Sequence, residues 1–341
     1  MSVKKIAFLI FLLLENISFT LTGFSQVTEE GPIRVMFYNV ENLFDTWNDT
    51  LIDDEEFNLG GPRGWNLDKY WNKVHSLSKV ILAIGGWSPP DIIGLCEIEN
   101  KGVVEDLFNK TNLSGYNYKL IHKDSPDLRG IDVCMAYRED RVEVLDYDYF
   151  IPYVWQKENY HSREVLHAAL NISGDTLHLF FNHWPSRRGG VLATQGRRTE
   201  LSDFIGYKID SLVSAEGNNI NLIIMGDFNS SPDDETITTL FKRRDGIKLV
   251  NLSESWPVGA GSYKYQGKWE YIDQIIISEN LLYGYNGIKT STAKSGVFHA
   301  DFLLGRDKNY TGERPLSTWW GYSYDGGYSD HLPVFLDIVG Y

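Results

Sequence analysis

Short apolar segments that end beside a carboxylate, amide or imidazole side chain recur along the whole sequence. Residues 33–40 contain Asn39 close to their end, and residues 91–97 end at Glu97. A third apolar run stops just before Asp227. Their length and apolar content are typical of β-strands, and the loop after a strand carries polar side chains out of the core. We therefore expect these polar residues at the edge of a sheet.

Helical periodicity separates the predicted strands. Apolar residues recur at helical spacing over residues 70–84 and again over residues 201–212. Residues 165–172 and 176–183 flank a turn-type sequence, which predicts an antiparallel hairpin. This mixture of hairpins and helices indicates α/β layers rather than a purely parallel sheet.

The N-terminus carries the pattern of a secretory signal. Lys4 and Lys5 precede the apolar residues 6–14, a run that suits a signal-peptide core and is too short to cross a bilayer as a helix. We predict a signal peptide over residues 1–25 and a periplasmic or secreted protein without a stable membrane anchor. A buried N-terminal strand or helix is the alternative.

Residues 26–341 are predicted to form one domain, because no Pro/Gly/Ser linker, repeat or low-complexity tract divides them. Cys96 and Cys134 both lie in apolar runs, where a thiol usually behaves as a small buried hydrophobe. We predict no disulfide framework, so the chain tolerates an oxidising compartment without depending on it.

A formal net charge of -14 argues against tight, sequence-independent binding of nucleic acid. Such affinity comes largely from Lys and Arg side chains that neutralise phosphates, so local cations or a metal would be needed. Ordinary solvated charges are the alternative reading of each basic pair. The local candidates are Arg187 with Arg188, Arg197 with Arg198, and residues 242–244.

The tetrapeptide Gly226-Asp227-Phe228-Asn229 follows a compact apolar run. Asp227 can orient and deprotonate a water, and Asn229 can donate to a developing oxyanion without adding negative charge. This division of labour suits attack on phosphorus. An ordinary Asx turn is the alternative.

A second polar motif, Ser329-Asp330-His331, stands before the last predicted strand. There Asp330 can coordinate a hard cation while His331 faces a phosphate as a cationic donor. Asp273 lies inside an otherwise apolar run, where an acid is seldom left unpaired, and can hold the imidazole in place. The alternative for each residue alone is a salt-bridged structural role.

Side chains with oxygen atoms that can bind a metal also lie at the ends of two predicted strands. A carboxylate such as Glu97 with an amide such as Asn39 suits Mg²⁺, which prefers oxygen and keeps several waters. Zinc fits less well, because neither cysteine has a nearby His or Cys in the sequence.

His183 follows Asn182 at the end of the predicted hairpin. A second histidine can protonate a leaving alkoxide or hold a nonbridging oxygen. A structural imidazole beneath Trp184 is the alternative. The remaining histidines that we weighed have no comparable setting and receive no role: His122, His161, His167 and His178.

Taken in order along the chain, these motifs resemble the endonuclease/exonuclease/phosphatase superfamily, which includes deoxyribonuclease I-like enzymes. The resemblance covers residues 33–338. It implies a four-layer α/β/β/α sandwich, with two mixed sheets packed face to face and helices outside. The motifs are Tyr38-Asn39-Val40-Glu41-Asn42, Glu97, Asn182-His183, Gly226-Asp227-Phe228-Asn229, Asp273 and Ser329-Asp330-His331.

The resemblance also implies a role for each residue and a divalent cation, Mg²⁺ or alternatively Mn²⁺. Different branches place either a histidine or an asparagine at the strand end before Trp184, so Asn182 and His183 both remain candidates. Asp132 is a possible support for His183. The resemblance implies that Asn39 and Glu97 bind the metal, with Asp330 assisting. It implies that Asp227 activates water and that Asn229 stabilises the transition state. It also implies that His331 contacts the scissile phosphate and is oriented by Asp273.

Three further motifs look like a bacterial secreted nuclease-like branch of this superfamily. They predict an exported, monomeric, metal-dependent hydrolase of phosphate esters, in the first place a phosphodiesterase or nuclease acting on DNA or RNA. The motifs are Arg129-Gly130-Ile131-Asp132, Asn182-His183-Trp184-Pro185-Ser186 and Trp269-Glu270-Tyr271-Ile272-Asp273-Gln274.

Two other functions stay open from the sequence. A phosphatase or lipid phosphodiesterase acting on a small substrate agrees with the acidic charge and with the aromatic residues 319–328, since aromatic rings near a site can stack on bases, sugars or headgroups. A noncatalytic binding module of the same fold is the other alternative, against which the intact set of acids and histidines argues.

Overall fold

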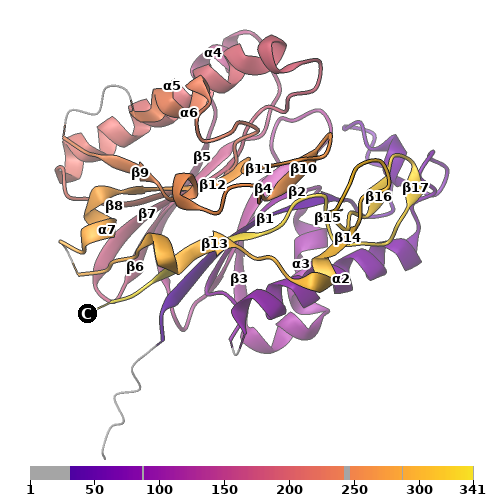
Figure 1. Ribbon diagram of the computed structural model, residues 1–341, viewed down its shortest axis with the longest axis horizontal. Helices are drawn as coiled ribbons and strands as arrows, with labels where there is room; N and C mark the ends of the chain where they lie inside the picture. Colours follow the sequence, from indigo (N-terminus) through magenta and orange to yellow (C-terminus); the bar gives the residue numbers. More distant parts are fainter. Residues whose placement is uncertain (1–30, 87, 242–245, 286, 341) are drawn as a thin grey trace, which may run out of the picture. The chain divides into compact units, whose positions relative to one another are not determined.

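The structure, a computed structural model, describes residues 31–86, 88–241, 246–285 and 287–340. The predicted signal peptide, residues 1–25, and the basic residues 242–244 lie outside these described residues. From Ile33 onward the chain forms one unit, in which two large sheets lie between two sets of helices (Figure 1).

The first sheet is mixed and has β1 near its centre. β1 pairs in parallel with β2 and antiparallel with β18, and β2 continues antiparallel to β4. Its six strands, in spatial order, are β13 (Ser295–Val297), β18 (Val334–Ile338), β1 (Ile33–Leu43), β2 (Ile92–Ile98), β4 (Asp132–Arg138) and β3 (Tyr118–Ile121).

The second sheet is also mixed and is organised around β8. This strand pairs in parallel with β7 and antiparallel with β12, and β6 and β7 form the predicted antiparallel hairpin. The strand β5 was not predicted, because most of its side chains are exposed and it lacks an apolar run. In spatial order the strands are β5 (Glu143–Phe150), β6 (Val165–Ile172), β7 (Asp175–His183), β8 (Asn221–Asp227), β12 (Asp273–Ser278) and β9 (Leu249–Asn251).

Helices cover the outer face of each sheet. Apolar residues of α2 and α3 pack with the first sheet, and those of α5 pack with the second (Figure 1). The predicted four-layer sandwich is therefore confirmed. The helices are α2 (Leu67–Gly85), α3 (Lys101–Asn109), α4 (Tyr153–Lys157), α5 (Val191–Glu216), α6 (Glu235–Thr238) and α7 (Glu279–Tyr283).

Shorter elements fill the connections between the layers. The 3-10 turns are Glu55–Phe57, Asn112–Tyr116, Thr239–Phe241, Leu252–Ser255, Thr292–Lys294 and Asp301–Leu303. The two-stranded ribbons pair β10 (Tyr263–Tyr265) with β11 (Lys268–Glu270), β14 (Leu304–Arg306) with β15 (Glu313–Pro315), and β16 (Trp319–Trp320) with β17 (Ser323–Tyr324).

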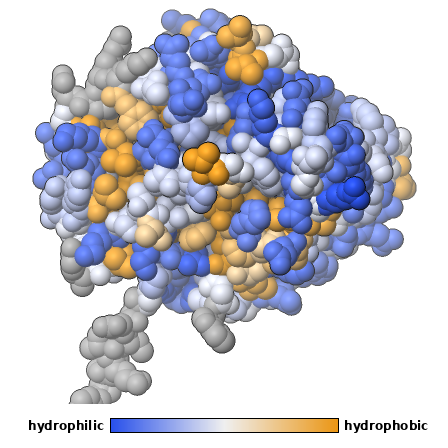
Figure 2. Space-filling view, viewed as in Figure 1, coloured by the Kyte–Doolittle hydropathy of each residue, from blue (hydrophilic) through white to orange (hydrophobic). Residues whose placement is uncertain are grey.

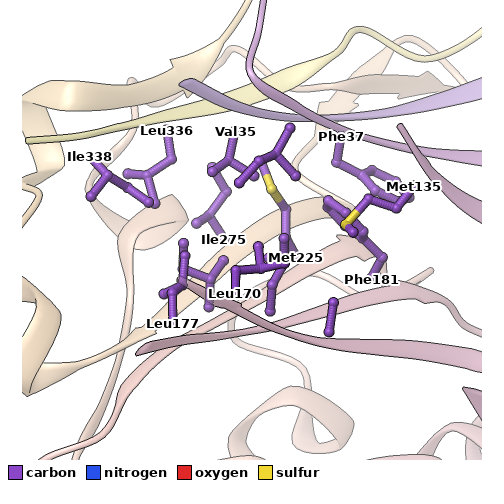
Figure 3. Close-up of a cluster of buried hydrophobic side chains, with 14 of the residues drawn as sticks. Val35, Phe37, Met135, Leu170, Leu177, Phe181, Met225, Ile275, Leu336 and Ile338 are labelled. Carbon is purple, nitrogen blue, oxygen red and sulfur yellow. The ribbon is translucent and has the colours of Figure 1, made fainter. Parts of the chain in front are cut away.

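The facing surfaces of the two sheets form a continuous apolar core. Figure 3 shows Val35 and Phe37 of the first sheet opposite Met225 and Ile275 of the second. Phe181 packs against Phe37 with ring centroids 5.8 Å apart. Burial of this kind holds the two sheets together, since the hydrophobic contribution scales with the apolar area removed from water.

The alternation of side chains along each strand also places polar residues at one end of this core. Side chains two residues apart on a strand point to the same face, so a polar residue two positions from a core residue faces the opposite sheet. The pairs, core residue first, are Phe37 and Asn39, Phe181 and His183, Met225 and Asp227, and Ile275 and Asp273. The geometry of the strands therefore places a polar cluster where the core ends.

One face of the molecule can be seen in a space-filling view. The face in Figure 2 is mostly hydrophilic, with apolar residues in separate patches. Within the described residues, none of the helices combines the length and the apolar composition that crossing a bilayer requires.

Replacing Gly94 with Ala tests the close approach of the two sheets. A Cβ at Gly94 of β2 would overlap the ring of Phe181 on β7. We expect Gly94→Ala to lower the free energy of unfolding by about 1–3 kcal/mol, the typical cost of overpacking. Urea unfolding followed by tryptophan fluorescence measures the change.

Gly296 of β13 gives the matched control, because a Cβ there would meet only Phe335, at an ordinary 3.7 Å. Gly296→Ala should change stability by about 0.5 kcal/mol or less. Adding Phe181→Leu to Gly94→Ala should restore part of the loss. Equal stability of Gly94→Ala and wild type would contradict the close contact.

Candidate active site

The pairing registers bring the predicted residues into one row at the end of the core. His183 on β7 lies directly opposite Asp227 on β8, and Asp227 lies directly opposite Asp273 on β12. On the first sheet, Asn39 is paired with Cys96, the residue before Glu97. Asn39 Nδ2 donates to Asp227 Oδ2 at 3.1 Å, which joins the two sheets through a polar contact.

Asp227 is the buried centre of this row. Its Oδ1 accepts from the backbone N–H of Asn229 at 2.9 Å. Its Oδ2 lies 3.7 Å from His183 Nε2 and 3.9 Å from His331 Nε2. Burial raises the pKa of Asp227 to about 7, against the charge of His331, which lowers it. A carboxylate with such a pKa can accept a proton near neutral pH.

His331 is held by Asp273, as expected. His331 Nδ1 and Asp273 Oδ2 are 2.7 Å apart. Burial alone would lower the pKa of His331, but the hydrogen bond to Asp273 and the charges of Asp273, Asp227 and Asp330 raise it well above its ordinary value. The ring is therefore an imidazolium whose Nε2–H is free to donate to an anion.

His183 has the opposite electrostatic character. Its Nε2 lies 3.8 Å from Glu97 Oε1, and its Nδ1 is buried without a hydrogen-bond partner among the described residues. Burial, followed by the charges of Arg163, Arg129 and His331, lowers the pKa of His183 well below its ordinary value. The surroundings thus shift the pKa values of the two imidazoles in opposite directions, favouring the neutral form of His183 and the protonated form of His331.

Of the two neighbours at this strand end, the structure places His183 at the cavity and Asn182 inside the protein. Asn182 Nδ2 donates to the carbonyl oxygens of Phe180 and Met225, and its Oδ1 accepts from Trp184 Nε1. Asn182 is fully buried. Its side chain supports the fold below the site.

Glu97 and Asp330 both line the cavity. The Asn39 amide lies between the carboxylates of Glu97 and Asp227, and its Nδ2 donates to both. Glu97 Oε2 accepts from the backbone N–H of Asn42 at 2.9 Å, and Oε1 faces Asn39 Nδ2 at 3.3 Å. Asn39 Oδ1 accepts from the N–H of Glu41 at 3.0 Å. In this arrangement Asn39 orients Glu97, and its amide oxygen faces the backbone of Glu41.

This donor set fits a hard divalent cation. Glu97, Asp227 and Asp330 line one cavity, so three carboxyl groups share a confined space. Such oxygen donors suit Mg²⁺ or Mn²⁺ better than zinc. Ligand atoms of Asp227, Asp273 and His331 also lie within 4.8 Å of one another. The Asp273–His331 hydrogen bond already uses two of these groups.

Asn229 adopts a left-handed backbone conformation, with φ of 48°. One hydrogen of Nδ2 donates to the carbonyl of Trp184 at 3.1 Å, which leaves the second for a ligand. Arg187 Nε donates to the Asn229 carbonyl and Arg187 Nη1 to Glu270, both at 2.7 Å. These two contacts were not predicted, because Arg187, Asn229 and Glu270 are distant in the chain.

A cavity of about 490 Å³ opens above these groups. Besides Asn229 and the acids and histidines described above, its lining includes three arginines and two tyrosines. These residues are Arg129, Arg187, Arg188, Tyr263 and Tyr265. The predicted basic pair Arg187-Arg188 therefore lies at the cavity, while Arg197 binds Glu158 and Glu200 elsewhere on α5.

One suggestion from the sequence is wrong, and one alternative that it left open is not supported. Asp132 does not support His183: its Oδ2 lies 2.9 Å from His122 Nε2, and its Oδ1 accepts from the N–H of Ser125. The aromatic residues 319–328 do not line the cavity. Trp319 instead packs against the guanidinium of Arg63, on the side of the first sheet that faces α2.

Comparison with known proteins agrees with this architecture. Residues 34–339 match the model of the Endonuclease/Exonuclease/phosphatase family. None of the curated proteins matches the chain. Because the family model spans nearly the whole chain, the protein belongs to the Endonuclease/Exonuclease/phosphatase family.

Solved structures share the fold at low sequence identity. A humanized D. rerio TDP2 superimposes with a TM-score of 0.57 at 16% identity, covering 90% of this chain and 98% of that one. A family protein from Bacteroides thetaiotaomicron gives 0.56 at 15%, covering 91% and 98%. The Bacteroides thetaiotaomicron mannosyl-6-phosphatase gives 0.56 at 16%, covering 90% and 99%.

The Asp273–His331 pair makes a prediction about protonation. Asp273→Asn removes the negative charge that raises the pKa of His331, and leaves burial, which lowers it. We expect the His331 imidazole to lose its proton at a lower pH than in the wild type. NMR titration of the ring Cε1–H signal measures this, and the His167 signal should not move, because His167 contacts His178 rather than the site. An unchanged His331 titration would contradict the pairing.

Proposed function

We propose that this protein is a divalent-metal-dependent phosphodiesterase that cleaves nucleic acid or a related phosphodiester by attack of water. The observation that supports this best is the buried Asp227 carboxylate, whose Oδ2 lies within 4 Å of the Nε2 atoms of both His183 and His331. This arrangement provides a proton acceptor and an anion-binding donor a few ångströms apart, which is what hydrolysis of a phosphate ester requires.

In the proposed reaction each residue acts at a defined atom. Asp227 takes the proton of the attacking water, and Asn39 fixes the orientation of its carboxylate. His331 Nε2–H and the free Nδ2–H of Asn229 donate to the phosphoryl oxygens as negative charge develops. His183 can bind a nonbridging oxygen, or give a proton to the leaving oxygen once protonated.

Glu97 with Asp330 would hold the cation, for which we propose Mg²⁺ with Mn²⁺ as the alternative. A bound divalent cation would polarise a phosphoryl oxygen and offset the charge of the substrate. Asn42 and Asn39 keep the Glu97 carboxylate in place through hydrogen bonds at 2.9 and 3.3 Å. The protein thus presents oriented oxygen donors at the cavity.

A phosphomonoesterase is the second candidate. The cavity is compact, which suits a small substrate, and one protein of the same fold is a mannosyl-6-phosphatase. The arginines beside His183 favour the phosphodiester, because an extended substrate carries additional phosphates to bind them.

A panel of substrates tests the proposal. Purified protein with Mg²⁺ or Mn²⁺ should cleave plasmid DNA, RNA or bis(p-nitrophenyl) phosphate, and EDTA should abolish the activity until metal is restored. Asp227→Asn should lower the rate by about 100-fold or more with an unchanged melting temperature, because it removes the proton acceptor.

Asp233→Asn is the matched control, since Asp233 is an exposed acid six residues away and should keep wild-type activity. Cleavage of p-nitrophenyl phosphate alone would replace the phosphodiesterase by the phosphomonoesterase. Full activity of Asp227→Asn would refute the assigned proton acceptor.

We also propose that residues 1–25 direct export to the periplasm or exterior. The support is Lys4 and Lys5 ahead of the apolar residues 6–14. Full-length protein produced in a Gram-negative host should appear in the periplasm or medium with an N-terminus near residue 26. Mass spectrometry of the purified protein measures this, and retention of residues 1–25 in the cytoplasm would exclude it.

A further inference from the structure

Three guanidinium groups line the cavity in addition to its acids and histidines. Arg129, Arg187 and Arg188 line it together with His331, although the whole chain carries a net charge of -14. Guanidinium groups gathered at one cavity of an acidic protein mark a site for an anion, since they would otherwise repel one another.

The three arginines differ in what they already bind. Arg187 is committed to the Asn229 carbonyl and to Glu270. Arg188 is exposed and has no ion-pair or hydrogen-bond partner within the described residues. Arg187 therefore acts as a positioning residue for Asn229, while Arg188 is available to a ligand.

Arg129 is only weakly neutralised. Its Nε lies 3.4 Å from Asp127 Oδ1, while the same carboxylate binds the buried Arg163 at 3.1 Å. Two guanidinium groups thus share one carboxylate, and a positive charge remains at the cavity wall. Arg129 lines the same cavity as His183, Asp227 and His331, which places it near the reacting groups.

The loop that carries Arg188 adds to this positive field. It leads through Gly189 and Gly190 into α5, whose first turn has no side-chain cap. Beneath the loop, the fully buried Arg198 donates to the carbonyl oxygens of Pro185 and Val191 and to Thr194 Oγ1, and its Nε has no partner among the described residues. None of these acceptors is a carboxylate, and the negative charge that acts on Arg198 is that of Asp234.

We propose that Arg129 and Arg188 form a subsite for a second phosphate group of the substrate, beside the phosphoester that His331 and Asp227 act on. The inference rests on the proposed function and narrows it to substrates with two neighbouring phosphates. The second phosphate can belong to the next nucleotide of a polynucleotide or to a small bisphosphorylated molecule. A lipid phosphodiester with a single phosphate would leave the subsite empty.

Two pairs of substrates, each differing by one phosphate, test the subsite. The first pair is the thymidine dinucleotide with and without a 5′-terminal phosphate, and the second is the methyl diester of glucose 1-phosphate with and without a phosphate at C6, so that every substrate keeps a phosphodiester. With Mg²⁺, the wild type should show a kcat/KM about 10- to 100-fold higher for the doubly phosphorylated member of at least one pair, as expected for one or two charge-assisted hydrogen bonds. The pair that shows the effect identifies the source of the phosphate.

The double variant Arg129→Ala/Arg188→Ala should bring this ratio close to one, and its melting temperature reports on folding. Arg306→Ala, at an exposed arginine of β14 outside the cavity, is the matched control and should keep the wild-type ratio. A wild-type ratio near one for both pairs, or a ratio that survives the double substitution, would overturn the subsite.

A binding experiment separates the subsite from the proposed function. The Asp227→Asn variant should bind thymidine 3′,5′-bisphosphate about tenfold more tightly than thymidine 5′-monophosphate by calorimetry, and adding Arg129→Ala/Arg188→Ala should remove the difference. Preferential binding without any hydrolysis by the wild type would support the subsite and refute the phosphodiesterase. Hydrolysis together with equal binding of the two nucleotides would refute the subsite alone.

Discussion

The apolar contact between the two sheets is the interaction on which the site depends. Phe181 and Met225 of the second sheet pack towards Phe37 of the first, and the strand alternation carries the same faces on to His183, Asp227 and Asn39. Because the two sheets approach closely at Gly94, there is little freedom for these polar side chains to separate. The site is thus the polar end of the hydrophobic core.

Burial gives these polar groups their chemical character. The same exclusion of water raises the pKa of Asp227 and lowers that of His183, while Asp273 and its acidic neighbours keep His331 protonated. One small volume therefore contains a proton acceptor, a neutral imidazole and a cationic donor. Sites of acid–base chemistry commonly combine titratable groups whose surroundings shift their pKa values in opposite directions.

The sequence predicted most of the fold and the composition of the site. The strand runs ending at Glu97 and before Asp227 were found because a buried strand leaves a long apolar signal. β5 was missed because its side chains are mostly exposed.

By itself the sequence determined which side chains stand at strand ends, since periodicity and turn residues are local properties. Only the tertiary structure decided that His183 and not Asn182 lies at the cavity, that Asp132 pairs with His122, and that Arg187 holds Asn229. These contacts depend on strand register and on the packing of the sheets. Register and packing arise from residues far apart in the chain, because burying one continuous apolar face selects a single alignment of the strands.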